Sequence, residues 1–551
     1  MPVIARALDR RLAGHRIVLF LFVAAFVLFF LAFREGVDRG YHHDVGSVGP
    51  FTYAVAALHA QNVHGIDGYV YLAPALGDTA NVMTKALGWH WADDWRNSAA
   101  WVDEDLGKAF GQGTLPPPAN TLEAPYDGLF PVGWGMDIGY VDFIDLAFAL
   151  FGHNLASLYM AFFTVLLFSM AVFALSYPRS VIAASALVFL AAGLFGLIAT
   201  NPDTFFLAHS LNSPNNPRFL SMFVIIPVMH IAHALFDKRR LTLWCVVGIF
   251  LQTAVLFFAF HNRTTAAWGM VAFLVLATVA IVLAWPQARR ALLWRRLVIA
   301  GAVIVVFATG VEHVTSRIHP VAEIKGQVTR HTLWTSAYCA LTHHGDWLPK
   351  YSEYHEGTQC EDAARIAAAK YFERNPSPEF EAAFDPKTKG FRNHAALDTF
   401  VRKAYFEMVE DDPTYVLETL MLVNPYRVGY MVSDGIVHMV ESYLETGRKW
   451  SHIGGVILVA AIVLAGGFLG SSWRSWRRGA VASGIALGLT VVSGLPNMLV
   501  LVLWDSLIDS YILAFVAMCT LAVFALATVF RVAMLWLERI RDTHTTGPVA
   551  H

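Results

Sequence analysis

Asp44 is the first residue of this sequence whose type and place indicate chemistry. The stretch GYHHDVGSVGPF, residues 40–51, follows an apolar run that ends at Phe33. A carboxylate so near the hydrocarbon boundary is costly unless it is solvated or paired, and an ionised carboxylate can act as a general base or bind a cation. The structural alternative is that Asp44 caps the following helix by accepting backbone N–H groups. Both interpretations stay open from the residues alone.

A second acid and a set of cations surround other apolar runs. Asp137 in GMDIGY is the reserve candidate for the base. Arg218 in HSLNSPNNPRF and Arg263 in FHNRTTAAW, beside His261, have no acidic residue within four positions. Isolated cations at span ends suit a phosphate group, so these three are candidate phosphate ligands. The alternative is that the arginines reach toward lipid headgroups.

Two groups of histidines are candidates for other roles. RHTLWTSAYCALTHHGD, residues 330–346, contains the imidazole and carboxylate groups that divalent ions accept. Adjacent His343 and His344 point apart on a helix or strand, so we predict that this segment either caps the mouth of the active site or shapes the acceptor site. We predict no metal site, although a divalent ion stays possible as a cofactor. His230 and His233 share one helical face and predict a polar contact between helices.

The composition indicates a polytopic membrane protein. The 551 residues are 56% hydrophobic and 15% charged, whereas about a quarter of residues are charged in soluble domains. The net charge of −2 gives no indication of a nucleic-acid partner. The sequence contains no GxxxxGK[ST] motif, and the glycines of GWGMDIG, residues 133–139, are not predicted to follow a strand. Neither of these two signals for a nucleotide site is therefore expected. We predict an all-α fold with ten spans, at about 17–33, 157–177, 181–200, 218–236, 241–260, 264–285, 297–312, 453–470, 480–503 and 511–536.

Basic residues orient these spans. Among the short loops, those on one side hold nearly all the arginines and lysines, for example Lys238, Arg239, Arg240, Arg289, Arg290, Arg295 and Arg296. By the positive-inside rule both termini are cytoplasmic. The first run has no small-residue cleavage pattern, which favours a retained anchor. We therefore expect a multi-pass protein of the bacterial inner membrane with two large extracytoplasmic segments, about 34–156 and 313–452.

The sequence predicts three regions. Residues 1–312 form a transmembrane module that includes loop 34–156, residues 313–452 form a helical extracytoplasmic domain, and residues 453–551 hold the last spans and a cytoplasmic tail. A helix along the membrane, with Ile144, Phe148, Phe151 and Leu155 at helical spacing, leads into the second span through a turn at Gly152.

The extracytoplasmic domain shows its own helical patterns. One apolar face groups Leu397, Phe400, Val401, Ala404 and Met408. A second helix is predicted over DAARIAAAKYF, and turns over NPSPEF and DPKTKG. Cys339 and Cys360 either form a disulfide bond, which persists outside the cytoplasm, or stay two buried thiols.

The layout of about the first 270 residues resembles the GT-C superfamily of membrane glycosyltransferases. The resemblance lies in one span, then a long outer loop that opens with an acid and returns through DIGYVDFIDLAFALFGHNLASLYMAFF. It implies a sugar transferred with inversion from a polyprenyl-phosphate carrier to a glycan, lipid or protein acceptor, with Asp44 as base and cations at the phosphate. Family members often have paired acids where this chain has His42 and His43 before Asp44.

Two other functions fit part of the pattern. O-antigen ligases and polymerases also combine many spans with a large outer loop, but they lack a long acid-bearing loop after the first span. A transporter or flippase needs polar residues within its spans. Here Gln252, His230 and His233 are almost the only ones, which favours the glycosyltransferase.

Overall fold

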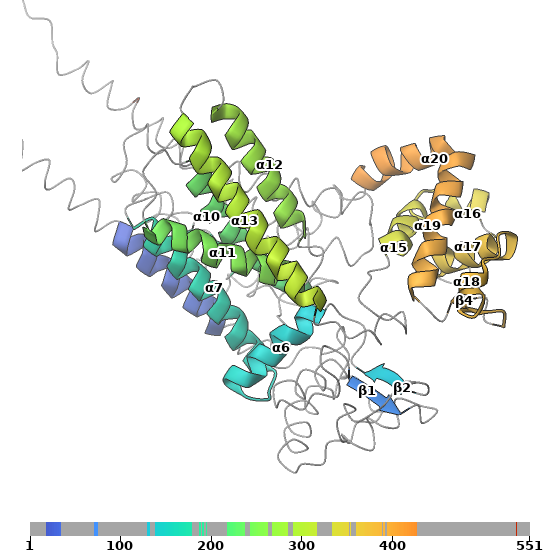
Figure 1. Cartoon of the computed structure of the whole chain (residues 1–551), viewed down its shortest axis with the longest axis horizontal. Coiled ribbons are helices and arrows are strands. Elements are labelled where there is room, and N and C mark those ends of the chain that lie inside the picture. The colour runs from blue at the N-terminus through green and yellow to red at the C-terminus, as the bar shows by residue number, and fades with distance from the viewer. Residues whose placement is uncertain are drawn as a thin grey trace, which may run out of the picture.

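The computed structural model describes residues 18–34, 71–74, 129–132, 138–178, 217–236, 243–262, 267–284, 290–316, 333–351, 360–387, 390–391 and 394–426, with a few single positions between and after them. These residues are mostly helical, as Figure 1 shows. The spans predicted at 453–470, 480–503 and 511–536 lie outside the described residues except for Trp536.

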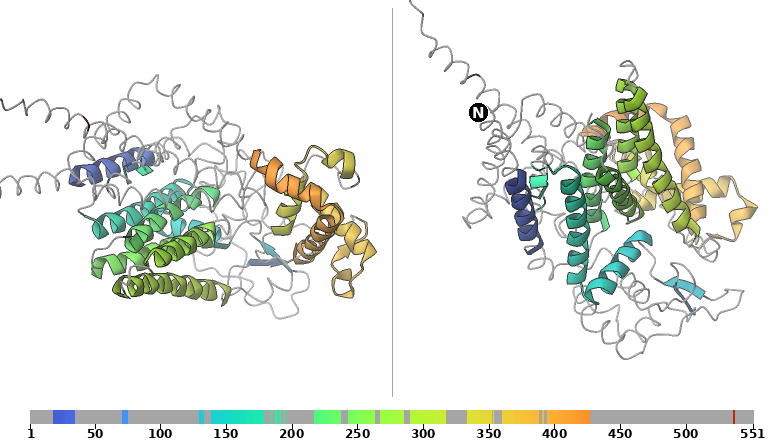
Figure 2. Two further views of the ribbon diagram at one scale, coloured as in Figure 1. Left: turned by 90° about the horizontal axis from the view of Figure 1, so that it is seen from above. Right: turned by 60° about the vertical axis from the view of Figure 1, so that its left-hand side comes forward.

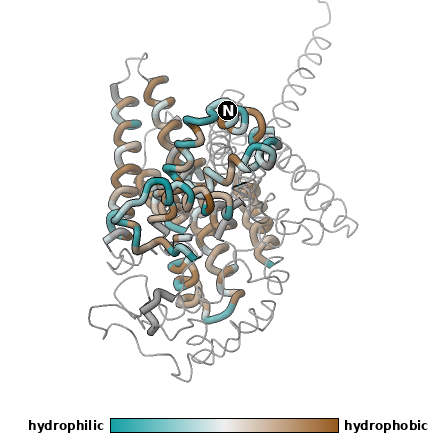
Figure 3. The backbone as a smooth tube through the Cα atoms, turned by 90° about the vertical axis from the view of Figure 1, so that its right-hand side faces the viewer, coloured by the Kyte–Doolittle hydropathy of each residue, from teal (hydrophilic) through white to brown (hydrophobic). Residues whose placement is uncertain are grey.

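Three helices are long and apolar enough to cross a membrane. They are α7 (Ala156–Ser176), α11 (Leu243–Asn262) and the segment Leu293–Val314 within α13 (Arg290–Ser316). Shorter apolar helices cover Val18–Arg34, Met222–Leu235 and Phe273–Val282, the last within α12 (Ala267–Ala284). These helices lie side by side in Figure 2, and most of their length is apolar in Figure 3. The described part therefore agrees with a membrane protein, while the total of ten spans stays a prediction.

The fourth predicted span, 218–236, does not form one regular helix. It begins as the 3₁₀-helix η5 (Pro217–Val224) and continues as α10 (Ile225–Phe236). Pro227 stands in the first turn of α10, where it has no N–H to donate to the carbonyl of Phe223. Because the hydrogen bond between Pro227 and Phe223 is missing, the regular α-helix is interrupted before Pro227. This accounts for the change from a 3₁₀-helix to an α-helix.

Polar contacts join the membrane helices at two levels. In the middle, Ser169 Oγ donates to Gln252 Oε1 at 2.6 Å, and Gln252 Nε2 donates to the Ser169 carbonyl at 2.8 Å. At the end predicted to be cytoplasmic, Arg295 donates to the Ala234 carbonyl at 2.9 Å and Arg296 to the Leu235 carbonyl at 3.0 Å. These guanidinium groups satisfy the last carbonyls of α10, which have no partner within the helix.

Two short antiparallel pairs add strands to the all-α fold predicted from the sequence. β1 (Tyr71–Pro74) pairs with β2 (Leu129–Val132), with Tyr71 opposite Val132. β3 (Phe384–Asp385) pairs with β4 (Gly390–Phe391) around the predicted turn DPKTKG. The described residues are therefore mainly helical, with these two short strand pairs as additions. The sequence did not predict the strands because four and two residues show too little alternation of apolar and polar side chains.

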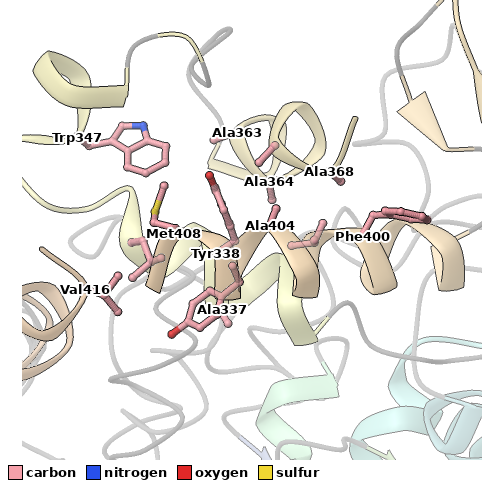
Figure 4. Close-up of a cluster of buried hydrophobic side chains, with 14 of the residues drawn as sticks. Ala337, Tyr338, Trp347, Ala363, Ala364, Ala368, Phe400, Ala404, Met408 and Val416 are labelled. Atoms are coloured by element: carbon pink, nitrogen blue, oxygen red, sulfur yellow. The ribbon is translucent and has the colours of Figure 1, made fainter. Parts of the chain in front are cut away.

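Residues 333–426 form a helical unit with its own core. It contains α15 (Leu333–Leu341), α16 (Trp347–Tyr351), α17 (Cys360–Arg374), α18 (Pro378–Glu381), α19 (His394–Asp411), α20 (Pro413–Glu418) and the π-helix η9 (Thr419–Val423). We call this unit the helical module; Figure 4 shows its core. The predicted face of α19 is confirmed, since Phe400, Val401, Ala404 and Met408 are buried against α15 and α17.

Two further predictions from the sequence, a turn and the state of the cysteines, can be compared with the structure of the helical module. NPSPEF, predicted as a turn, contains the one-turn helix α18 with Pro378 at its start.

Cys339, buried in α15, is disulfide-bonded, and α15 packs against α17, which begins at Cys360. This agrees with the predicted Cys339–Cys360 pair rather than with two free thiols.

Asp412 caps α20 and ties it to α16. Its carboxylate accepts the Tyr415 backbone N–H at 3.2 Å, the Tyr351 hydroxyl at 3.0 Å and the Lys350 ammonium at 3.3 Å. The pKa of Asp412 is lowered, first by the Tyr415 N–H bond and then by the Tyr351 and Lys350 contacts. All three contacts favour the ionised carboxylate, and proton uptake therefore weakens the cap.

Asp412→Ala is expected to destabilise α20 by about 0.5–2 kcal/mol at neutral pH. Because the pKa is lowered in the fold, this stabilisation is complete above the ordinary value near 3.8 and is lost as the pH falls below it. Hydrogen exchange of α20 amides in the full chain measures the effect. Exposed Asp411, one residue earlier, is the control: Asp411→Ala should leave exchange unchanged. Equal protection in Asp412→Ala and the native chain would contradict the prediction.

Candidate functional site

The helix predicted to lie along the membrane is α6 (Ile138–Phe151), which packs against α7 and α11. Its apolar face buries Tyr140, Phe143, Ile144 and Phe148. The turn into α7 is at Gly152, as predicted, with a φ of 94° that favours glycine. Ser157 donates to the Gly152 carbonyl at 2.5 Å, and Asn154 Oδ1 accepts the Ser157 N–H at 3.0 Å. This turn fixes the direction of α6 relative to α7 (Figure 1).

α6 begins in close contact with the end of α11. A Cβ atom built on Gly139 would lie 2.1 Å from the His261 carbonyl oxygen and 2.5 Å from the Asn262 nitrogen. Real Cβ atoms do not approach so closely, so only glycine permits this backbone contact. We call the contact of Gly139 with His261 and Asn262 the α6–α11 junction.

Asp142 and His261 form a side-chain hydrogen bond at this junction. The Oδ2 atom of Asp142 lies 2.6 Å from Nε2 of His261, and the side chains are 24% and 11% exposed. The His261 ring stacks on Phe257 in the preceding turn, with centroids 6.0 Å apart and planes at 5°. Phe257 in turn packs on Phe307 of α13, with centroids 5.5 Å apart. The imidazole is therefore held both by a carboxylate and by an aromatic face.

A carboxylate paired with an imidazole has two chemical uses. It sets which ring nitrogen carries the proton, and it stabilises the imidazolium form when that ring accepts a second proton. The pair can thus present a positively charged or proton-exchanging ring at a helix end. Partial exposure of both side chains leaves the pair accessible to a ligand.

The structure describes part of the predicted site. His261 is placed at the junction. Arg218 is the second residue of η5, but its side chain is outside the description. Asp44, Asp137 and Arg263 lie outside the described residues.

Asp142 was absent from the candidates predicted from the sequence. The sequence feature that could have identified Asp142 is a carboxylate within an apolar helix predicted to lie next to the membrane, because such a carboxylate requires a polar partner. The partner is 119 residues away in the sequence, so the spacing of residues could not identify it.

The other histidines behave differently from one another. Among the described residues no three His, Cys, Asp or Glu side chains gather as a metal site. His344 Nδ1 accepts the Asp346 N–H at 3.0 Å, and its Nε2 lies 3.9 Å from Glu418. These contacts join His344 to Asp346 and Glu418 within the helical module, which indicates a structural role.

His230 corrects one expectation about contacts between membrane helices. It is fully buried, yet neither ring nitrogen has a hydrogen-bond partner in the part of the chain that the structure describes. Its ring packs on Phe173 and Tyr177 of the region ending α7, with centroids 5.5 and 5.3 Å away. Gly248 of α11 leaves room for it, since a Cβ there would lie 2.9 Å from the imidazole. The helix contact of His230 is therefore aromatic at its ring, and its polar part is at the backbone, where the Tyr177 hydroxyl donates to the His230 carbonyl at 3.4 Å.

No protein-family model, curated protein or solved structure matches this chain.

Proposed function

We propose that this chain is a membrane glycosyltransferase that moves a sugar from a polyprenyl-phosphate carrier to an acceptor on the extracytoplasmic side. The Asp142–His261 pair is the observation that supports this proposal most. It lies where α6, the helix that returns from the first outer loop, meets the predicted extracytoplasmic end of α11. A proton-exchanging group at that boundary is suited to a substrate with an apolar tail and a charged head.

The junction also joins the two sequence segments that supplied other candidates. Asp137 stands two residues before Gly139, and Arg263 directly follows Asn262. An acid for the acceptor and cations for the phosphate thus come from segments whose neighbouring residues are in contact at Gly139 and His261. The contact of these two segments at Gly139 and His261 supports the proposal that both contribute to one site.

The proposed reaction assigns a role to each group. Asp44, with Asp137 in reserve, accepts the proton of the acceptor hydroxyl while its oxygen attacks the anomeric carbon. The bond from that carbon to the phosphate oxygen breaks, and the polyprenyl phosphate departs with the electron pair. His261, held by Asp142, joins Arg218 and Arg263 in stabilising the negative charge on the phosphate. The attack from the opposite face inverts the anomeric configuration.

Asp44→Asn is expected to abolish transfer while the chain still inserts in the membrane. The probe is a set of radiolabelled pentoses and hexoses on decaprenyl and undecaprenyl phosphate, added to membranes of cells that overproduce the chain. The measurement is release of the free polyprenyl phosphate and the anomeric configuration of the product. Asp38→Asn, a matched change in the same segment, is the control and should retain transfer.

Each result of this assay decides a separate point. If Asp44→Asn is active and Asp137→Asn is inactive, the base is Asp137. If the native chain releases no carrier phosphate from any donor but equilibrates labelled lipid across the bilayer, the chain is a flippase and the transferase proposal is refuted. Transfer of an intact preassembled glycan from a diphosphate carrier would instead indicate a ligase.

A further inference from the structure

The helical module exposes apolar side chains on one segment. Among its described residues, the large exposed apolar ones are Phe406, Leu417, Met421, Leu422 and Tyr426. Phe406 is partly covered by Trp334, with ring centroids 5.3 Å apart. The other four all belong to the continuous helix 413–426, formed by α20, η9 and one last turn. We call this segment the apolar ridge.

The apolar ridge has two distinct sides. Tyr415, Val416, Thr419 and Asn424 are buried against the module, and Tyr415 donates from its hydroxyl to the Leu341 carbonyl at 2.6 Å. The opposite side exposes Leu417 at 58%, Met421 at 65%, Leu422 at 64% and Tyr426 at 78%. One face of the ridge thus packs against the module, and the other face exposes apolar side chains.

Charge separates the ridge from the rest of the module surface. Glu418 is the only charged residue in 413–426; its side chain is exposed, and its carboxylate lies 3.9 Å from His344 of the module. By contrast, α17 exposes Arg365, Glu373 and Arg374. A surface of leucine, methionine and tyrosine with almost no charge is typical of a helix at the membrane interface, where tyrosine prefers the headgroup level.

We propose that the apolar ridge rests on the lipid of the extracytoplasmic leaflet and holds the helical module against the membrane. Apart from Phe406 and Trp536, the other exposed large apolar side chains of the described residues occur on the membrane helices and on α6, for example Leu150 and Leu175. The ridge therefore has the surface character of the lipid-facing helices rather than that of the module. The chain also leaves the ridge at Tyr426, and only residues 427–452 separate it from the next predicted span.

This continuity favours lipid over a second copy of the chain. A module tethered through its ridge to a membrane span is already at the bilayer surface, so contact with lipid needs no partner to diffuse to it. The proposal does not depend on sugar transfer, and it holds for any function of the chain.

Fluorescence quenching of the full chain tests this proposal. Met421→Cys is labelled with bimane in a Cys245→Ala, Cys519→Ala background, which retains Cys339, and is reconstituted in vesicles of phosphatidylethanolamine and phosphatidylglycerol. Exposed Glu379 of α18 supplies the matched control, Glu379→Cys. We expect nitroxide-labelled lipid to quench the label at 421 several-fold more than at 379, and aqueous iodide to do the reverse.

Either of two results overturns the proposal. If iodide quenches both labels equally and lipid nitroxide quenches neither, the ridge lies in water. If neither quencher reaches the label at 421, protein covers the ridge, and cross-linking would show whether that protein is a second copy. Both labelled positions are exposed, and for this reason neither substitution is expected to disturb folding.

Discussion

If the proposed reaction is correct, Asp142→Asn is expected to lower sugar transfer about 100-fold, because an amide orients the His261 ring, which we propose stabilises the departing phosphate, less firmly than a carboxylate does. The two side chains are 2.6 Å apart and only partly exposed, so water replaces the lost charge poorly. The measurement is turnover of a polyprenyl-phosphate sugar by the purified chain across a range of pH.

Two comparisons separate this role from a structural one. Asp145→Asn changes an acid on the same helix, one turn later, and should retain most of the activity. The double variant Asp142→Asn, His261→Ala should be no worse than His261→Ala alone if the two residues act as one unit. Additive losses, or an Asp142→Asn chain with native turnover and lower thermal stability, would show that the pair only joins α6 to α11.

Gly139→Ala is expected to abolish activity and to destabilise the chain by about 1–3 kcal/mol, the usual cost of overpacking. The added Cβ would lie 2.1 Å from the His261 carbonyl, a backbone atom that cannot rotate away. α6 must therefore move from α11, which also separates Asp142 from His261. Turnover and thermal unfolding in detergent measure the two effects.

Gly301→Ala is the matched control for this change. Gly301 also lies in a helix, α13, but nothing stands within 4 Å of its Cβ position. Since alanine favours the helix more than glycine does, this variant should be neutral or more stable by up to about 1 kcal/mol. If both alanine variants behave alike, close approach at the junction does not limit the protein.

Local patterns in the sequence predicted local structure well. The helical spacing of Ile144, Phe148 and Phe151 predicted α6, because an apolar face at that spacing is typical of a helix, whereas Leu155 of the same pattern lies beyond the turn at Gly152. The face of α19 followed for the same reason. The long apolar runs that became α7, α11 and α13 were equally clear, since a bilayer requires about 20 apolar residues.

Features that depend on distant residues could not be predicted. β1 pairs with β2 across more than fifty residues, and neither strand is long enough to show alternation. Asp142 meets His261 only because Gly139 permits close packing, and no property of the sequence relates the three. His230 differs again: its ring packs on Phe173 and Tyr177, and its ring nitrogens make no hydrogen bond within the described residues, an environment that the sequence does not indicate.

The bonded state of Cys339 has a consequence for the order in which the protein matures. This sulfur lies in α15 with no exposed surface, and the core formed with α17 and α19 closes over it. An oxidant cannot reach a sealed thiol, so the bond must form while the helices are still loosely associated. If the helical module is extracytoplasmic as predicted, its export to an oxidising compartment must therefore come before the final packing of α15, and a chain retained among reducing thiols would keep Cys339 reduced.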